Sequence, residues 1–185
     1  RQLSLFFPSL HGDILIFFAE NFKLAVNNRA FRLSIVYGID RVKAMTCYDP
    51  YSPEEYLMNT ITPPNFVAVD GKDYTMTGEL EAVTEQNWFQ PETALQYKEQ
   101  AMAELSAQGV TFPLVFPYYY RVDQANQDLV AQVIEQQLEE LLGKDYIDIV
   151  PVAGPANNYN SEVRNAGKYG LMEEGWGPDF ADPVT

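Results

Sequence analysis

The stretch Phe112–Val152, FPLVFPYYYRVDQANQDLVAQVIEQQLEELLGKDYIDIVPV, decides the fold of this chain. It opens with the apolar and aromatic run Phe112–Tyr119 and closes with Tyr146–Val152, where apolar residues alternate with others. Both patterns are typical of strands. Between them, apolar residues recur at helical spacing over Asp123–Leu142, and Gly143 follows as a stop signal. A strand, a helix and a strand in this order fold through a right-handed crossover into a parallel pair that the helix covers.

The helix in this stretch carries the clearest pattern in the sequence. Asp123 is its predicted N-cap, because a carboxylate can accept hydrogen bonds from the first backbone N–H groups. Its apolar stripe consists of Leu129, Val130, Val133, Ile134, Leu138, Leu141 and Leu142. Pro113 and Pro117 interrupt the strand before it. Since proline has no N–H for a ladder, we expect that strand to be irregular or to lie at a sheet edge.

Helices and strands alternate on both sides of this stretch. A helix is predicted over Pro91–Ala107, with Gly109 as the left-handed residue that follows it. Its predicted buried face consists of Ala94, Leu95, Ala101, Met102 and Leu105. Asn157–Tyr169 is compatible with another helix and Leu171–Trp176 with a last strand. The second half therefore predicts an α/β fold, with a largely parallel sheet covered by helices.

The first half is less regular. Leu3–Phe7 and Ile14–Phe18 are short, apolar runs rich in aromatic and branched residues, which predicts two strands. Asn27-Asn28 offers an N-cap for a helix over Arg29–Met45. Gly38 lies in the middle of that helix, and we expect either close packing or a local break there.

A long segment without a clear period follows. The capping box Ser52–Glu55 predicts a short helix that ends near Asn59. From Thr60 to Phe89 the sequence describes an irregular excursion of about 30 residues, longer than compact domains usually contain without a functional reason. We expect this excursion either to line a site or to cover an edge.

Composition restricts the functions that this chain can have. Its 185 residues fit one domain, and a net charge of −14 disfavours binding to nucleic acid. No apolar run approaches the roughly 20 residues of a membrane span. The only cysteine, Cys47, lies in an apolar run that favours a buried small side chain, and the only histidine, His11, makes a histidine-based zinc site or triad very unfavourable. No cofactor or metal is expected.

The segment Glu174–Pro183, EGWGPDFADP, is the candidate binding site. Gly175 and Gly177 let another backbone approach closely, because they lack a Cβ. The segment follows the last predicted strand, and ligands of such sheets gather beyond the carboxyl ends of strands. On residue types alone, Trp176 is equally compatible with a core anchor in an ordinary surface turn.

Two segments resemble a known family. Phe31–Arg41, FRLSIVYGIDR, is similar to the R-x-A-x-x-x-A-I-D-R helix of the family 5 extracellular solute-binding proteins. Gly175–Pro183, GWGPDFADP, is similar to their G-W-x-A-D-Y-x-D-P turn, with Pro178 where Ala is usual. These proteins are the oligopeptide-binding subunits of bacterial ABC importers.

The resemblance implies a periplasmic-binding-protein-like lobe with a mixed sheet flanked by helices. The chain begins at Arg1 without an initiator Met, and we expect residues 1–185 to be the second lobe of a two-lobe receptor, excised as a fragment. The implied protein is extracytoplasmic, either periplasmic or lipid-anchored, and is a monomer with no enzymatic activity. Its implied partners are a peptide, the other lobe and the ABC permease subunits in the membrane.

In the resembling proteins, the Gly-Trp-x turn hydrogen-bonds the peptide backbone and the following Asp pairs with the α-ammonium. The matching positions are Gly175, Trp176, Gly177 and Asp179. The resemblance thus implies that these residues bind ligand. Asp182, which is part of an Asp-Pro pair, is interpreted as structural, an acceptor of hydrogen bonds within its own turn.

Alternatives remain for several residues. Glu173, Glu174, Asp179 and Asp182 are the carboxylates that a hydrolase would need, and a regulator that reads ligands with this lobe is a third class. Asp40 and Arg41 are interpreted as an ion pair or a tie between elements. Tyr118–Arg121 either lines peptide pockets or provides core and rim side chains at a strand end.

Overall fold

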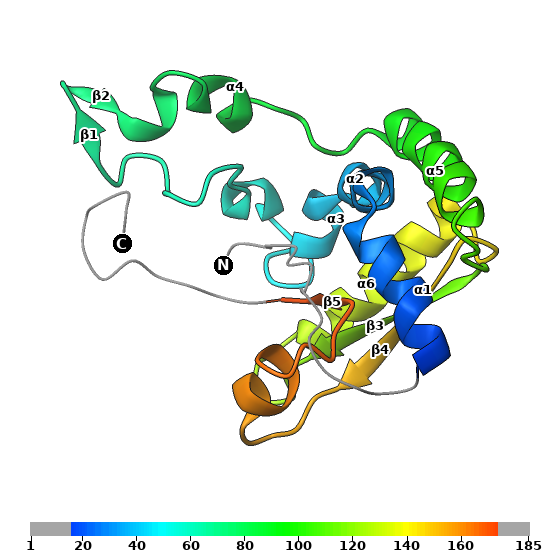
Figure 1. The fold of residues 1–185 in the computed structure, drawn as a ribbon. Coiled ribbons are helices and arrows are strands. Elements are labelled where there is room, and N and C mark those ends of the chain that lie inside the picture. The colour runs from blue at the N-terminus through cyan, green and yellow to red at the C-terminus, as the bar shows by residue number, and fades with distance from the viewer. Residues whose placement is uncertain (1–15, 174–185) are drawn as a thin grey trace.

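The computed structural model describes residues 16–173, which include a three-stranded parallel sheet (Figure 1). The strands are β3 (Leu114–Tyr120), β4 (Ile147–Ala153) and β5 (Leu171–Met172), in the order β4-β3-β5. β3 and β4 pair along their whole length, from Leu114 opposite Ile147 to Tyr120 opposite Ala153. The strand–helix–strand stretch therefore forms the parallel pair that its sequence predicts, and the predicted α/β class is confirmed.

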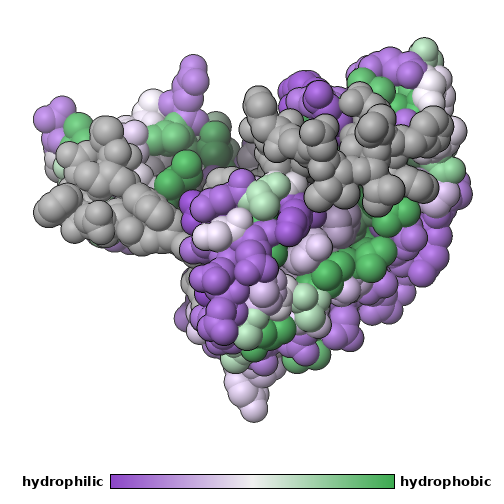
Figure 2. Space-filling view, turned by 60° about the horizontal axis from the view of Figure 1, so that its bottom comes forward, coloured by the Kyte–Doolittle hydropathy of each residue, from purple (hydrophilic) through white to green (hydrophobic). Residues whose placement is uncertain are grey.

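Four long helices gather on one side of this sheet (Figure 1). They are α1 (Ile16–Asn27), α2 (Arg29–Gly38), α5 (Pro91–Ser106) and α6 (Gln127–Leu142). Because the helices cover one face of the sheet, the side chains of β3 alternate in burial. Leu114, Phe116 and Tyr118 are buried, whereas Val115 is exposed. Figure 2 brings the lower side of the molecule forward and shows hydrophobic surface interspersed among hydrophilic side chains. None of the helices in residues 16–173 is both long and apolar enough to cross a membrane.

The segment between α3 (Arg41–Met45) and α5 extends away from this body, and we call residues 50–90 the arm (Figure 1). It contains η1 (Pro53–Tyr56), the antiparallel pair β1 (Ala68–Val69) and β2 (Lys72–Asp73), η2 (Tyr74–Met76) and α4 (Leu80–Thr84). At its base, Asn59 donates to the carbonyls of Thr84 and Gln86 at 2.8 and 2.9 Å. The predicted irregular excursion is thus confirmed as a long segment that contains only short elements. With the β1–β2 pair, the described residues include both parallel and antiparallel strand pairs.

Several helix ends agree with the sequence prediction. The Asn28 side chain accepts from the N–H of Phe31 at 2.8 Å and caps α2. Gly109 and Gly143, after α5 and α6, have φ of 83° and 89°, a backbone conformation that glycine adopts without a steric penalty.

The predicted helix over Arg29–Met45 is broken at the position where Gly38 indicates a break. α2 ends at Gly38, and Asp40 caps the new helix α3 by accepting from the N–H of Lys43 at 3.1 Å. Close packing is found there as well, because a Cβ on Gly38 would lie 3.1 Å from Cδ2 of Leu138.

The strand predicted over Ile14–Phe18 is wrong, because α1 begins at Ile16. Ala25 and Val26 of this helix are buried, and the ring of Phe22 lies 4.9 Å from that of Phe116. An apolar run of this length does not distinguish a buried strand from a buried helix, and packing on the sheet decides between them. The strand predicted over Leu3–Phe7 lies outside the described residues.

The expectation that Phe112–Tyr119 lies at a sheet edge is also wrong, because β3 is the central strand. The prolines are accommodated because β5 pairs only with Tyr118 and Tyr119, beyond both of them. The carbonyl of Pro117 still accepts from the N–H of Gly170 at 2.8 Å.

The predicted N-cap Asp123 is wrong, because the N-cap of α6 is Asn126, three residues later and in a left-handed conformation. Asp123 instead pairs with Arg121, at 3.1 Å between the guanidinium and the carboxylate. Two members of the predicted apolar faces are exposed, Leu129 at 47% and Leu95 at 39%, because each stripe is wider than the surface it packs against.

Two further predicted helices are shorter than expected. Ser52 makes no side-chain cap bond, and the helix after it is the single turn η1. The Asp49 carboxylate accepts the N–H groups of Tyr51 and Ser52 before this turn. In place of a helix over Asn157–Tyr169, the structure has one short helical turn over Asn160–Arg164. The last predicted strand is present at Leu171–Met172 and does not include Glu173, and the rest of its predicted range lies outside the described residues.

Candidate functional site

The predicted ligand-binding residues Gly175, Trp176, Gly177 and Asp179 lie outside the described residues, and so does Asp182. The description ends at Glu173, two residues before Gly175. What can be built from the structure is therefore the place from which the candidate segment starts, the carboxyl end of β5.

β5 is held close to the centre of the sheet by a glycine. Gly170 donates its N–H to the carbonyl of Pro117, and a Cβ on Gly170 would lie 2.6 Å from the ring of Phe116. Any larger side chain would push the strand away from this ring. Leu171 and Met172 then pair with Tyr118 and Tyr119 in parallel register and are both buried.

Glu173 follows β5 and is only 4% exposed. Its carboxylate accepts from the hydroxyl of Tyr48, with oxygen–oxygen distances of 2.7 and 2.9 Å. A buried carboxylate is expensive unless it is hydrogen-bonded. Burial, and then the negative charge of Glu173, raise the pKa of the Tyr118 hydroxyl well above its usual value, so Tyr118 stays neutral.

Tyr118–Tyr120 are the last residues of β3, and Arg121 follows them beside this end of the sheet. Tyr118 is core, whereas Tyr119 packs on a small buried cluster that consists of Tyr159, Val163, Tyr169 and Met172. The hydroxyl of Tyr159 donates to the carbonyl of Tyr119 at 3.0 Å. The guanidinium of Arg121 lies 5.1 Å from the centre of the Tyr159 ring. These contacts favour the interpretation as core and rim side chains.

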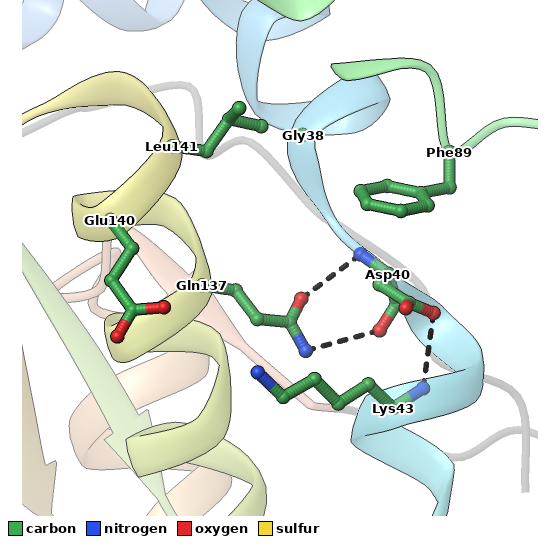
Figure 3. A pocket seen from close by; sticks show the side chains of 7 residues that line it. All are labelled: Gly38, Asp40, Lys43, Phe89, Gln137, Glu140 and Leu141. Atoms are coloured by element: carbon green, nitrogen blue, oxygen red, sulfur yellow. Dashed lines mark hydrogen bonds between the residues drawn. The ribbon is translucent and has the colours of Figure 1, made fainter.

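Asp40 and Arg41 tie elements together, as predicted. Arg41 donates to the carbonyl of Met58 and to the side chain of Asn59, at 3.0 and 2.5 Å, and so fixes the base of the arm. The side-chain oxygen of Gln137 on α6 accepts from the N–H of Asp40 at 2.9 Å, and its side-chain nitrogen donates to the carbonyl of Asp40 at 3.2 Å (Figure 3).

A shallow pocket of about 300 Å³ opens beside this junction (Figure 3). It is lined by Gly38, Asp40, Lys43, Phe89, Gln137, Glu140 and Leu141. Gln137 is 8% exposed and its amide is hydrogen-bonded to the Asp40 backbone. The pocket therefore lies on the outer side of a structural contact between α6 and Asp40.

Among the described side chains there is no group of three or more His, Cys, Asp or Glu that could hold a metal ion. Cys47, which its apolar surroundings predict to be buried, packs against the main core but is only partly buried. Burial and the charge of Asp128 raise the pKa of its thiol, which disfavours the reactive thiolate.

The link between Tyr48 and Glu173 is the feature that sequence reasoning missed. Glu173 directly follows the buried pair Leu171-Met172, and an acidic residue in that position is the signal that indicates a buried carboxylate. Nothing in the sequence indicates Tyr48 as its partner, since the two residues are 125 positions apart.

Comparison with known families gives one match that covers most of the chain. The model described as "Bacterial extracellular solute-binding proteins, family 5 Middle" matches residues 7–185. The oligopeptide-binding protein AliB of Streptococcus pneumoniae is 30% identical over 187 aligned residues, which cover 87% of this chain. AliA of the same species is 33% identical over 88% of this chain. The chain spans 28% of the length of each of these two relatives.

Solved structures show the same fold. The substrate-binding domain of an oligopeptide ABC transporter from Bacillus anthracis superposes with a TM-score of 0.67 and 21% identity, covering 86% of this chain and 28% of that one. The peptide-binding pheromone receptor PrgZ superposes with a TM-score of 0.57 and 20% identity, covering 86% and 29%. The lobe thus has the α/β architecture that its sequence predicts.

Proposed function

Because this chain belongs to the bacterial extracellular solute-binding proteins of family 5, we propose that it is one lobe of a receptor that captures oligopeptides outside the cytoplasm. The receptor delivers them to an ABC permease in the membrane. It acts as a monomer, without enzymatic activity, and it is either periplasmic or held at the cell surface by a lipid anchor.

One observation carries this proposal. The family match extends over residues 7–185, so it includes both Phe31–Arg41 and the Gly175–Asp179 turn. AliA and AliB, which are similar over nearly nine-tenths of the chain, are both oligopeptide-binding proteins. Within the described residues, β5 ends at Met172, three positions before Gly175.

The proposed binding mode follows from the chemistry of the turn. Gly175, Trp176 and Gly177 hydrogen-bond the peptide backbone as an added strand would, which gives affinity without a choice of sequence. The carboxylate of Asp179 pairs with the α-ammonium of the peptide. The second lobe closes over the peptide from the other side, and contacts from both lobes favour the closed state.

The test is the substitution Asp179→Asn in the complete two-lobe receptor. We expect it to weaken binding of peptides with free N-termini by about 2 kcal/mol or more, since it removes the charged partner of a buried ammonium. N-acetylated peptides lack the ammonium, and their affinity should change little. Calorimetric titration of both peptide forms measures the difference.

The matched control is Glu140→Gln, which makes the same change in net charge at an exposed side chain on α6. It should leave both affinities unchanged. If Asp179→Asn binds both peptide forms as the wild type does, Asp179 is not the ammonium partner. If the wild-type receptor binds no peptide of either form, the proposed ligand class is wrong.

A further inference from the structure

The direction in which the chain leaves β5 is fixed by side chains more than by the sheet. β5 pairs with β3 over two residues only, Leu171 and Met172. A ladder this short contributes few hydrogen bonds. Leu171 is 0%, Met172 2% and Glu173 4% exposed, so three consecutive side chains are inserted into the protein just before the candidate turn.

Of these three side chains, Glu173 has the strictest requirement on its surroundings. Apolar side chains can shift within a core, whereas a buried carboxylate must keep its hydrogen bonds. Tyr48 supplies a charge-assisted hydrogen bond, 2.7 Å to one oxygen and 2.9 Å to the other. Such bonds are shorter and stronger than those between neutral groups.

Tyr48 is itself fixed in place. It follows α3, its N–H donates to the carbonyl of Met45 at 2.9 Å, and its ring packs against the main hydrophobic core. The bond to Glu173 therefore joins the segment after α3 to the end of β5. Tyr48 lies seven positions after Arg41 and Glu173 lies two positions before Gly175, so each is close in sequence to one of the two segments that resemble the family.

We propose that Tyr48 and Glu173 are positioning residues for peptide binding, which hold the chain so that the Gly175–Asp179 turn meets the ligand in a fixed geometry. The inference rests on the proposed function. Its physical basis is that a binding group must be held to within about 0.5 Å by neighbours that are themselves locked in place. Neither residue needs to contact the peptide.

The experiment compares Tyr48→Phe with Tyr146→Phe in the complete receptor. Tyr146 is the matched control, because its buried hydroxyl also makes a side-chain hydrogen bond, 3.1 Å to Ser34, but this bond joins α2 to the residue before β4 and does not involve the end of β5. Both variants lose one hydroxyl bond, so both should lower the unfolding temperature. Only Tyr48→Phe should weaken peptide binding, by about tenfold, the size of one charged hydrogen bond.

Glu173→Gln is the second variant, because it keeps the shape and an acceptor oxygen while it removes the charge. This variant should fold, and it should bind the peptides more weakly than the wild type does. The probe is a random-sequence oligopeptide mixture with free N-termini, with the same mixture N-acetylated, titrated by calorimetry. The loss should be larger for the free peptides, since displacement of the turn also displaces Asp179.

The outcomes separate this inference from the proposed function. If the wild type binds the free peptides and both Tyr48→Phe and Glu173→Gln bind them equally well, the positioning role is refuted and the proposed function stands. Equal weakening by Tyr48→Phe and Tyr146→Phe also refutes it, because a general loss of stability then explains both. If the wild type binds no peptide, both the positioning role and the proposed function are wrong.

Discussion

The carboxylate of Glu139 on α6 accepts the backbone N–H of Ile149 in β4, at 3.0 Å. β4 forms one edge of the described sheet, and the N–H groups on its outer side have no neighbouring strand to pair with. Glu139 is 6% exposed, and its other oxygen accepts from Lys144 at 2.8 Å. A helix side chain thus replaces the missing strand at this position.

Replacement of this carboxylate should destabilise the fold. Glu139→Ala leaves the N–H of Ile149 buried without its acceptor, and we expect a loss of about 1–3 kcal/mol in the free energy of unfolding. Glu139→Gln keeps an acceptor oxygen and should lose less. The measurement is urea denaturation, with Glu140→Ala on the exposed side of α6 as the control, expected to stay within about 0.5 kcal/mol of the wild type. Equal losses for Glu139→Ala and Glu140→Ala would contradict the role of the Ile149 bond.

A methyl group at Gly170 should displace β5. A Cβ there would lie 2.6 Å from Cδ1 of Phe116, whose ring is fully buried and packed against Phe22 and Phe31. We expect Gly170→Ala to lower the free energy of unfolding by about 1–3 kcal/mol, because the ring has little room to move. Phe116→Leu should relieve part of this clash in the double variant, which a double-mutant cycle measures. Strictly additive losses would show that the clash is not with Phe116.

The protein should lose stability in alkaline solution. Burial raises the pKa of both Tyr118 and Tyr146 in the folded protein, and Glu139 raises that of Lys144. For a group whose folded pKa is raised, the stabilisation is complete below the unfolded pKa and is lost as the pH rises from there through the folded pKa. The unfolded pKa of tyrosine is about 10, so the loss should begin near that pH.

Urea denaturation from neutral pH to about pH 11 measures this loss. Tyr146→Phe removes one of the buried titrating groups, and its stability should fall less steeply above pH 10 or so. Tyr51→Phe, at a side chain that is 93% exposed, is the control and should follow the wild type. A wild-type curve that stays flat up to about pH 11 would contradict the burial of these hydroxyls.

The elements that the sequence predicted correctly are those with a local signal. α6 and the ends of α5 follow from apolar spacing and from the glycines at 109 and 143, whose positive φ suits no larger residue well. The cap at Asn28 and the break at Gly38 are local signals of the same kind.

The errors have a common cause. Ile16 begins a helix rather than belonging to a strand, and β3 is central despite its prolines. The first outcome depends on the packing of α1 against Phe116. The second depends on β5, which is short enough to pair with β3 only beyond Pro117. The candidate turn at Gly175–Asp179 came from resemblance to a family, and its ligand contacts remain a prediction.

The sequence by itself determined the α/β class and the parallel pair of Phe112–Val152, because the helical period, the strand alternation and the glycine stops are properties of neighbouring residues. It also determined the family, through two short motifs. Only the tertiary structure decided that Tyr48 meets Glu173 and that Glu139 covers the edge of β4. A buried carboxylate needs a hydrogen-bond partner. Which residue becomes that partner depends on how distant segments pack, and a local sequence pattern does not contain this information.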